Sequence, residues 1–304
     1  MTENIKAHIL VFIATILIAF SFIISGKLSG LINPISLTLF RFVFAFILLL
    51  PIVLVIKKYR VRIKKSFSKG LKISLFYSLY FILLFKALEF TSALNTATLF
   101  TLVPLVTAVF ASFIFSDKLN ISKLIVYIIG MIGTLIVIFN GSLEAIINLT
   151  FNNGDIIFLF AVFAMATYSI SAKYFYEKDD EVLVITLMTL FGGIIWMSLA
   201  LIIFDIPLEW AKIEGQNFWY MVYLTIGATL FTVFLYQKAT IIIGPNKVMA
   251  YVYLNPAVVA LIMYIFEREV INIEVSFGIF LSTFATIFLL KQTSKKDEIK
   301  LVKL

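Results

Sequence analysis

Residues 254–272 read LNPAVVALIMYIFEREVIN, an apolar run that contains a proline and ends at charged residues. Residues 102–120 read LVPLVTAVFASFIFSDKLN, with a proline, an acid and an asparagine at the same three places. A proline inside a helix removes a backbone donor and interrupts the helix, so its recurrence at one place in two runs is informative. The two stretches predict an internal repeat, with helix breaks at Pro104 and Pro256.

The chain as a whole is strongly apolar. Its 304 residues are 62% hydrophobic and 14% charged, and the mean hydropathy is +1.07, whereas soluble domains average about 45–50% apolar and about 25% charged residues. A helix needs about 20 apolar residues to cross a bilayer. Ten such runs predict an all-α integral membrane protein with ten transmembrane helices, at approximately residues 8–25, 34–56, 70–88, 94–115, 122–139, 155–174, 182–204, 217–240, 246–266 and 273–290.

The repeat extends beyond the two prolines. Residues 152 positions apart match across the chain: Lys86 with Lys238, Ala108 with Ala260, Asn120 with Asn272 and Thr134 with Thr286. In the first helix of each half the separation is 146, which pairs Ser21 with Thr167 and Ser25 with Ser171. We therefore predict two five-helix repeats, residues 1–139 and 155–290, joined by the linker 140–154 and followed by a basic tail, 291–304. Because five is odd, the second repeat is inverted in the membrane, as in many transporters.

Lysine and arginine are distributed unevenly over the connections. Twenty of the 25 lie in the connections and ends that share a side with the N-terminus, and four lie on the other side. Basic residues accumulate on the cytoplasmic side of membrane proteins, so we predict an inner-membrane protein with both termini in the cytoplasm. This bias also accounts for the net charge of +8, and nucleic-acid binding is not indicated.

Residues typical of enzymes and metal sites are scarce. The chain has no cysteine and one histidine, His8, and it contains neither an H-E-x-x-H nor a G-x-S-x-G motif. No catalytic residue, metal site or cofactor is predicted. The charged run 177–181 is interpreted as a solvated turn.

The paired proline, acid and asparagine pattern resembles the EamA module of the drug/metabolite transporter superfamily. Residues 33–51, NPISLTLFRFVFAFILLLP, are similar to the second helix of that module and include Arg41. The resemblance implies a carrier, commonly an exporter of amino acids or other small metabolites, with a cavity lined by helices 1, 3, 4, 6, 8 and 9. Two features depart from the family pattern: Asp117 stands where the family usually has Glu, and the second half has Thr186, Leu187 and Met188 where an Arg equivalent would lie.

Several predicted helices carry polar residues on one face, at 100° per residue. On the ninth helix Lys247, Tyr251 and Asn255 follow one another at i, i+4 steps. Small hydroxyl residues also serve as packing contacts between membrane helices, and Lys247 also fits a positive-inside anchor. The candidate substrate-binding residues are Arg41, Asn95, Thr98, Thr167, Ser171, Thr229, Thr232, Tyr236, Lys247, Tyr251 and Asn255.

An ionisable residue inside a membrane helix is by default a functional candidate. Arg41 either attracts an anionic group of the substrate or is held structurally by neighbouring carbonyls. Asp117 and Glu269 end their runs on opposite sides of the membrane and are either gate residues or helix-end caps. No carboxylate stands at mid-membrane, so uniport, exchange and proton antiport all stay open, the last of them through Glu89, Asp155 or Glu269.

The sequence therefore predicts a carrier of small amphipathic carboxylates, with amino acids first, that works by alternating access among membrane lipids. A lipid flippase or a non-transporting accessory protein is the alternative on the same scaffold. The oligomeric state is left open.

Overall fold

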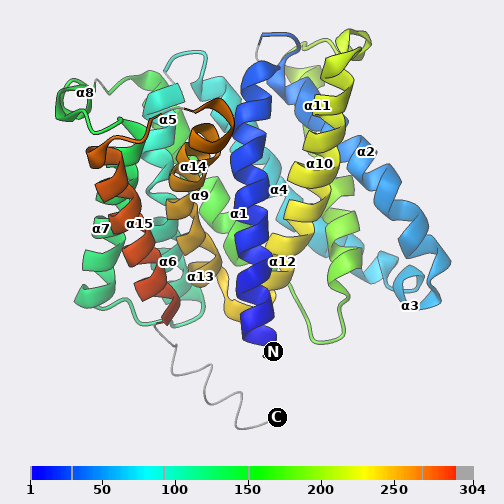
Figure 1. The fold of residues 1–304 in the computed structure, drawn as a ribbon. Coiled ribbons are helices and arrows are strands. Elements are labelled where there is room, and N and C mark those ends of the chain that lie inside the picture. Colours follow the sequence, from blue (N-terminus) through cyan, green and yellow to red (C-terminus); the bar gives the residue numbers. More distant parts are fainter. Residues whose placement is uncertain (1, 29, 92, 150, 269, 292–304) are drawn as a thin grey trace.

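The computed structural model describes residues 2–28, 30–91, 93–149, 151–268 and 270–291, and this part of the chain is entirely helices and connections (Figure 1). The first half comprises α1 (Glu3–Lys27), α2 (Pro34–Val55), α3 (Lys57–Arg60), α4 (Ile63–Ala87), α5 (Ala93–Phe100), α6 (Val103–Ile114), α7 (Ile121–Ile138) and α8 (Leu143–Ile147). The second comprises α9 (Asn153–Tyr174), α10 (Val182–Ile203), α11 (Gln216–Thr225), α12 (Thr232–Ile243), α13 (Pro245–Ala250), α14 (Asn255–Glu267) and α15 (Ile273–Lys291).

Ten helical segments of the described chain are long and apolar enough to cross a membrane, which confirms the predicted number. Three of these spans are interrupted. The fourth divides into α5 and α6 at residues 101–102, the eighth has a π-helical turn at Ile226–Phe231 between α11 and α12, and the ninth has a 3₁₀ turn at Tyr251–Leu254 between α13 and α14. Pro104 and Pro256 both stand in the first turn that follows an interruption, where a missing backbone N–H costs least.

The two ends of the bundle differ in what they carry. α1 begins and α15 ends at one end, which we call the termini end, and α8 lies at the other, which we call the linker end (Figure 1). The basic helix α3 is at the termini end (Figure 1). This arrangement is the one expected for an even number of spans.

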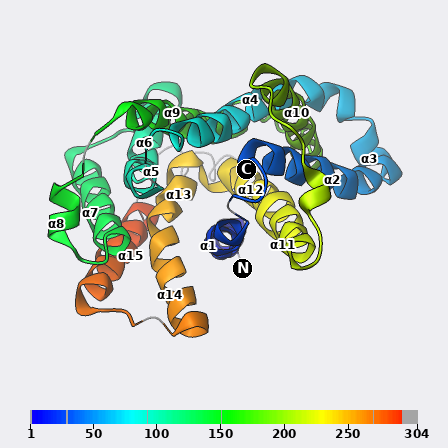
Figure 2. The same cartoon turned by 90° about the horizontal axis from the view of Figure 1, so that it is seen from above.

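One side of the bundle is a tightly packed group of α2, α4, α9 and α10 (Figure 2). A Cβ built on Gly70 would lie 2.4 Å from Cβ of Met188, and one on Gly192 would meet the hydroxyl of Ser74. Both glycines therefore allow α4 and α10 to approach more closely than larger residues would, as is usual between membrane helices.

At the other side α7 and α15 run next to each other (Figure 2). The Thr134 hydroxyl donates to the carbonyls of Gly130 and Tyr253, and the Thr286 hydroxyl donates to those of Ser282 and Ala250. The acceptors Gly130 and Ser282 are counterparts within α7 and α15, whereas Tyr253 and Ala250 both belong to the ninth span. This pair of threonines therefore attaches α7 and α15 to the same span.

Candidate functional site

A cavity of about 980 Å³ lies between the two halves. It opens at the linker end, where its lining includes Asn140 and Val270, the latter 87% exposed. On α1 the lining begins only at Ile18, so the termini half of this helix does not face the cavity. The lining comes from α1, α2, α4, α5, α7, α9, α11, α12, α14 and α15. Spans 2, 5 and 10 therefore contribute beyond the six that the resemblance implied.

The centre of the cavity is formed by equivalent parts of the two halves. Tyr80, Phe81 and Leu84 of α4 line it, and so do the residues 152 positions later on α12, Thr232, Val233 and Tyr236. Of these, Thr232 and Tyr236 were predicted. The aromatic residues of α4 were missed, although their positions could have been found by applying the repeat separation to Thr232 and Tyr236.

Much of the wall is aromatic. The rings of Tyr77 and Tyr168 stack with centroids 4.5 Å apart, and those of Tyr80 and Phe100 are 5.7 Å apart. All four residues line the cavity. Such a wall can accept the apolar body of a ligand, with orientation left to a small number of polar groups.

Arg41 is one of these polar groups. Its Nε donates to Oγ1 of Thr229 at 2.8 Å and its Nη2 donates to the carbonyl of Ala228 at 3.1 Å. Both acceptors belong to the π-helical turn of the eighth span, and Thr229 in turn donates to the carbonyl of Leu224. These bonds use two of the five N–H groups of a guanidinium. Within the described chain no carboxylate forms an ion pair with Arg41, so its charge faces the cavity uncompensated.

Asn255 is a second polar residue of the cavity wall. It begins α14, lines the cavity and is 6% exposed. Its Oδ1 has no hydrogen-bond partner among the described residues. An unpaired buried polar group costs about 1–3 kcal/mol, so this acceptor is expected to meet a donor that enters with a ligand or with water.

The predicted face of the ninth helix is not formed. An α-helix turns by about 100° per residue, whereas the 3₁₀ turn at Tyr251–Leu254 turns by about 120° per residue. The Asn255 side chain is therefore rotated away from the face that carries Lys247 and Tyr251. Asn255 lines the cavity, but Lys247 and Tyr251 do not. The i, i+4 expectation for these three residues was therefore wrong.

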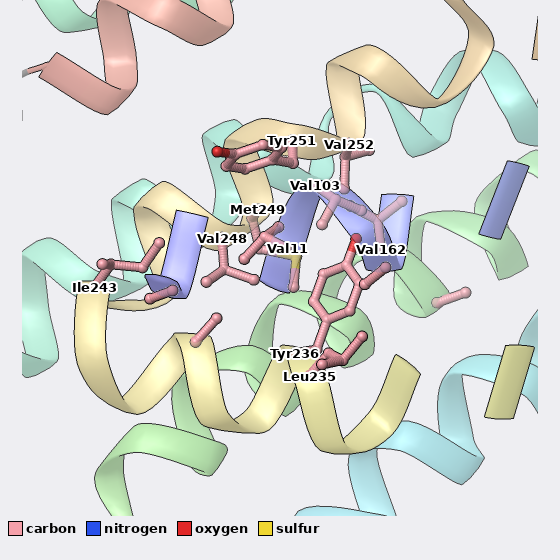
Figure 3. Packing of buried hydrophobic residues seen from close by; sticks show 14 of the residues in the cluster. Val11, Val103, Val162, Leu235, Tyr236, Ile243, Val248, Met249, Tyr251 and Val252 are labelled. Carbon is pink, nitrogen blue, oxygen red and sulfur yellow. The ribbon is translucent and has the colours of Figure 1, made fainter. Parts of the chain in front are cut away.

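Tyr251 contributes instead to the closure of the termini end. Its hydroxyl lies 3.2 Å from Nδ1 of His8. Figure 3 shows this ring close to Val11 and Met249, whereas the Tyr236 hydroxyl points toward Val103 and Val162. The buried cluster joins α1, α12 and α13 and seals the cavity floor.

The other predicted binding residues lie outside the lining. Asn95 donates to both carboxylate oxygens of Asp155, at 3.2 and 3.1 Å, and Asp155 is 1% exposed. Asp155 also accepts from Thr91 and from the backbone of Asn152, so it joins α9 to α5 and to the connection between α4 and α5. Thr98, Thr167, Ser171 and Thr229 do not line the cavity either. The Thr167 and Ser171 hydroxyls donate to carbonyls of their own helix, at Phe163 and Tyr168.

The charged connections at the termini end are more ordered than expected. Asp180 is 5% exposed and accepts from Lys69 at 2.5 Å, so the interpretation of 177–181 as a solvated turn was wrong for this residue. Hydrogen bonds from Lys65 and Lys69 lower the pKa of the neighbouring Glu177 carboxyl. Asp117 accepts from the amide of Asn246 at 3.1 Å. Glu269, the other predicted gate, lies outside the described residues.

Known proteins resemble this chain in fold and in sequence. A solved crystal structure has a TM-score of 0.75 with it, covering 96% of this chain and 99% of its own at 16% identity, which shows the fold alone. A Bacillus subtilis (strain 168) protein named "Uncharacterized transporter YyaM" is 25% identical over 182 residues. That match spans 60% of this chain and 59% of the relative's length.

A family model described as the EamA-like transporter family matches residues 5–139 and again residues 152–291. The double match agrees with the two repeats, and the two matches together span most of the chain. The match to this family confirms the prediction of a multi-pass membrane transporter, and the family is one of transporters and not of enzymes. This chain belongs to the EamA-like transporter family.

Proposed function

We propose that this transporter carries small amphipathic carboxylates, with amino acids first, across the inner membrane by alternating access. The observation that carries the proposal is Arg41, a cation that lines an otherwise largely apolar cavity and has no carboxylate partner among the described residues. A guanidinium outside water is stabilised by an anion, and its planar fork suits a carboxylate.

A second polar group of the lining suits the other end of an amino acid. Asn255 offers an unpaired acceptor, Oδ1, which an ammonium group can donate to. Tyr80, Phe81 and Phe100 offer aromatic surface for an apolar side chain. We therefore propose a ligand with a carboxylate at Arg41, a donor at Asn255 and an apolar body against α4 and α5.

The orientation follows from charge. We propose that the termini end faces the cytoplasm because it carries the basic connections around Lys57, Lys69 and Lys118. With that orientation the cavity opens outward, and the cluster around Tyr251 closes the cytoplasmic side.

Thermal unfolding of the purified protein with leucine and phenylalanine tests the proposal, because a ligand that binds the folded state raises its apparent stability. Each amino acid is compared with its carboxamide, which keeps the shape and removes the anion. We expect the amino acids, and not the amides, to raise the midpoint.

The same pairs are measured for Arg41→Lys and Arg41→Ala. Hydrogen bonds to charged groups contribute about 1.5–3 kcal/mol, so Arg41→Ala is expected to weaken binding roughly ten- to a hundredfold. Arg41→Lys keeps the charge and loses the fork, and its loss is expected to be smaller. Equal shifts with acid and amide in the unaltered protein contradict the proposal.

A further inference from the structure

The connection between α2 and α4 is densely basic and lies at the membrane surface. Eight of the sixteen residues in 57–72 are lysine or arginine, and none is acidic. α2 has 22 residues, so it is about 33 Å long and crosses a hydrocarbon core of roughly 30 Å. α3 begins two residues after α2 ends, and Figure 2 shows it at the outer edge of the bundle. α3 therefore lies at the depth of the lipid headgroups.

Seven of the eight basic residues fall into two groups, and the eighth, Lys72, lies over the ring of Phe175. The first group forms ion pairs with the connection between α9 and α10: Lys58 and Arg62 with Glu181, Lys65 with Glu177, and Lys69 with Glu177 and Asp180. Three carboxylates therefore neutralise most of the charge of these four residues.

The second group, which we call the basic edge, consists of Lys57, Arg60 and Lys64. All three are exposed, and none of them forms an ion pair within the described chain. Val61 and Arg62, which separate α3 from α4, keep right-handed helical backbone angles. Residues spaced at i, i+3 and i+7 share one side of helical backbone, so the three charges of the basic edge lie together.

Exposed apolar side chains flank the basic edge. Val55 is 81% exposed and Val61 is 66% exposed. At a membrane surface such side chains enter the boundary of the acyl chains, while lysine and arginine keep their charged ends among the headgroups. The surface thus combines the apolar and the cationic parts of a segment that lies on lipid.

We propose that the basic edge binds the headgroups of anionic phospholipids in the leaflet at the termini end. The Arg60 guanidinium suits a phosphate with two parallel hydrogen bonds, and the two lysines supply compact positive charges. A basic cluster directly beside a span is attracted to anionic lipids. Soluble phosphates carry the same charge, but the depth of α3 and the exposed valines favour a lipid.

The basic edge is also connected to the cavity wall. It joins α2, which carries Arg41, to α4, which carries Tyr80, and both of these residues line the cavity. Bound headgroups would therefore restrain the connection between two helices of the candidate site. The proposal concerns the lipid surface and does not depend on which ligand the cavity takes.

A single fluorophore on Val61→Cys tests the proposal, because the chain has no cysteine of its own. The full chain is placed in phosphatidylcholine nanodiscs that contain the same fraction of brominated phosphatidylglycerol or of brominated phosphatidylcholine. Bromine quenches a fluorophore that it contacts, so the ratio of the two quenching constants reports the preference for anionic lipid at this position. A second label on Leu143→Cys, which is 69% exposed at the linker end, reports the preference elsewhere.

Two matched sets of substitutions accompany the label on Val61→Cys. The first removes the basic edge and combines Lys57→Gln, Arg60→Gln and Lys64→Gln. The second removes the same charge from other parts of the termini end and combines Lys118→Gln, Lys123→Gln and Lys178→Gln.

We expect phosphatidylglycerol to be preferred over phosphatidylcholine next to Val61 by roughly ten- to a hundredfold at low salt, because each basic residue near the surface contributes about fivefold. The preference is expected to fall as salt is added. The first set of substitutions is expected to bring the ratio to about one, and the second set to leave it unchanged. The label on Leu143→Cys is expected to show no preference.

Three results would overturn the proposal. Equal quenching by the two lipids next to Val61 would mean that the basic edge binds no headgroup. A preference that survives the first set, or that is the same at both labels, would mean a general attraction to the charge of the protein. Loss of the preference in millimolar glycerol phosphate would make the surface a site for soluble phosphates and not for lipid.

Discussion

α6 and α14 carry nearly the same motif and stand in opposite surroundings. Both begin with a proline in the first turn, after an interrupted segment. In α6 the residue before that proline is Val103, which is fully buried. In α14 it is Asn255, which lines the cavity and carries a buried oxygen with no hydrogen-bond partner among the described residues. The motif therefore fixes where each span is interrupted, whereas the helix that follows the interruption meets the cavity in α14 but not in α6.

Among substitutions at the starts of these two helices, Asn255→Leu is expected to have the largest effect. We expect at least about tenfold weaker binding of leucine, because the acceptor for the ammonium group is lost. We also expect the unfolding midpoint without ligand to stay or rise, because the unpaired buried oxygen is removed. Thermal unfolding with and without ligand measures both. A lower midpoint with unchanged binding would make Asn255 a structural residue.

The reciprocal change, Val103→Asn, is the control. It buries a new amide where the described structure offers a packed apolar site, and we expect a destabilisation of about 1–3 kcal/mol. A neutral result would mean that the α6 site already admits water, and the contrast between the two helices would then be weaker than their burial indicates.

A smaller effect is expected where the halves agree. Asn120 accepts from the backbone of Lys123 at the start of α7, and Asn272 accepts from that of Val275 at the start of α15. Loss of such a cap costs about 0.5–2 kcal/mol. Asn272 also donates to Asn140, so Asn272→Ala is expected to lower the unfolding midpoint slightly more than Asn120→Ala. A reversed order would argue against equivalent roles.

Much of the fold could be predicted because the length of an apolar run and the recurrence of proline and asparagine can be seen directly in the sequence. The lengths of the apolar runs predicted ten spans, and the proline and asparagine pairs predicted the repeat. Arg41 and Asn255 stood out because charge and amide groups are costly inside an apolar helix.

Other parts depended on tertiary contacts. Lys247 and Tyr251 were placed by assuming one continuous α-helix, but the 3₁₀ turn at Tyr251–Leu254, which packs against α1, α7 and α15, interrupts that helix. The aromatic residues Tyr77 and Tyr80 were missed because aromatic side chains in a membrane helix face lipid as readily as a cavity. Asp155 looked like an ordinary span end until its partners on other helices were known.

Uptake into proteoliposomes tests the central claim, carboxylate recognition during transport, most directly. Vesicles containing the unaltered protein and preloaded with unlabelled leucine are given labelled leucine or labelled leucinamide outside. We predict that preloading accelerates the entry of leucine and leaves that of leucinamide at the level of protein-free vesicles, and that Arg41→Ala abolishes the difference. Equal entry of acid and amide, or movement of labelled lipid with no entry of either amino acid derivative, would contradict the account.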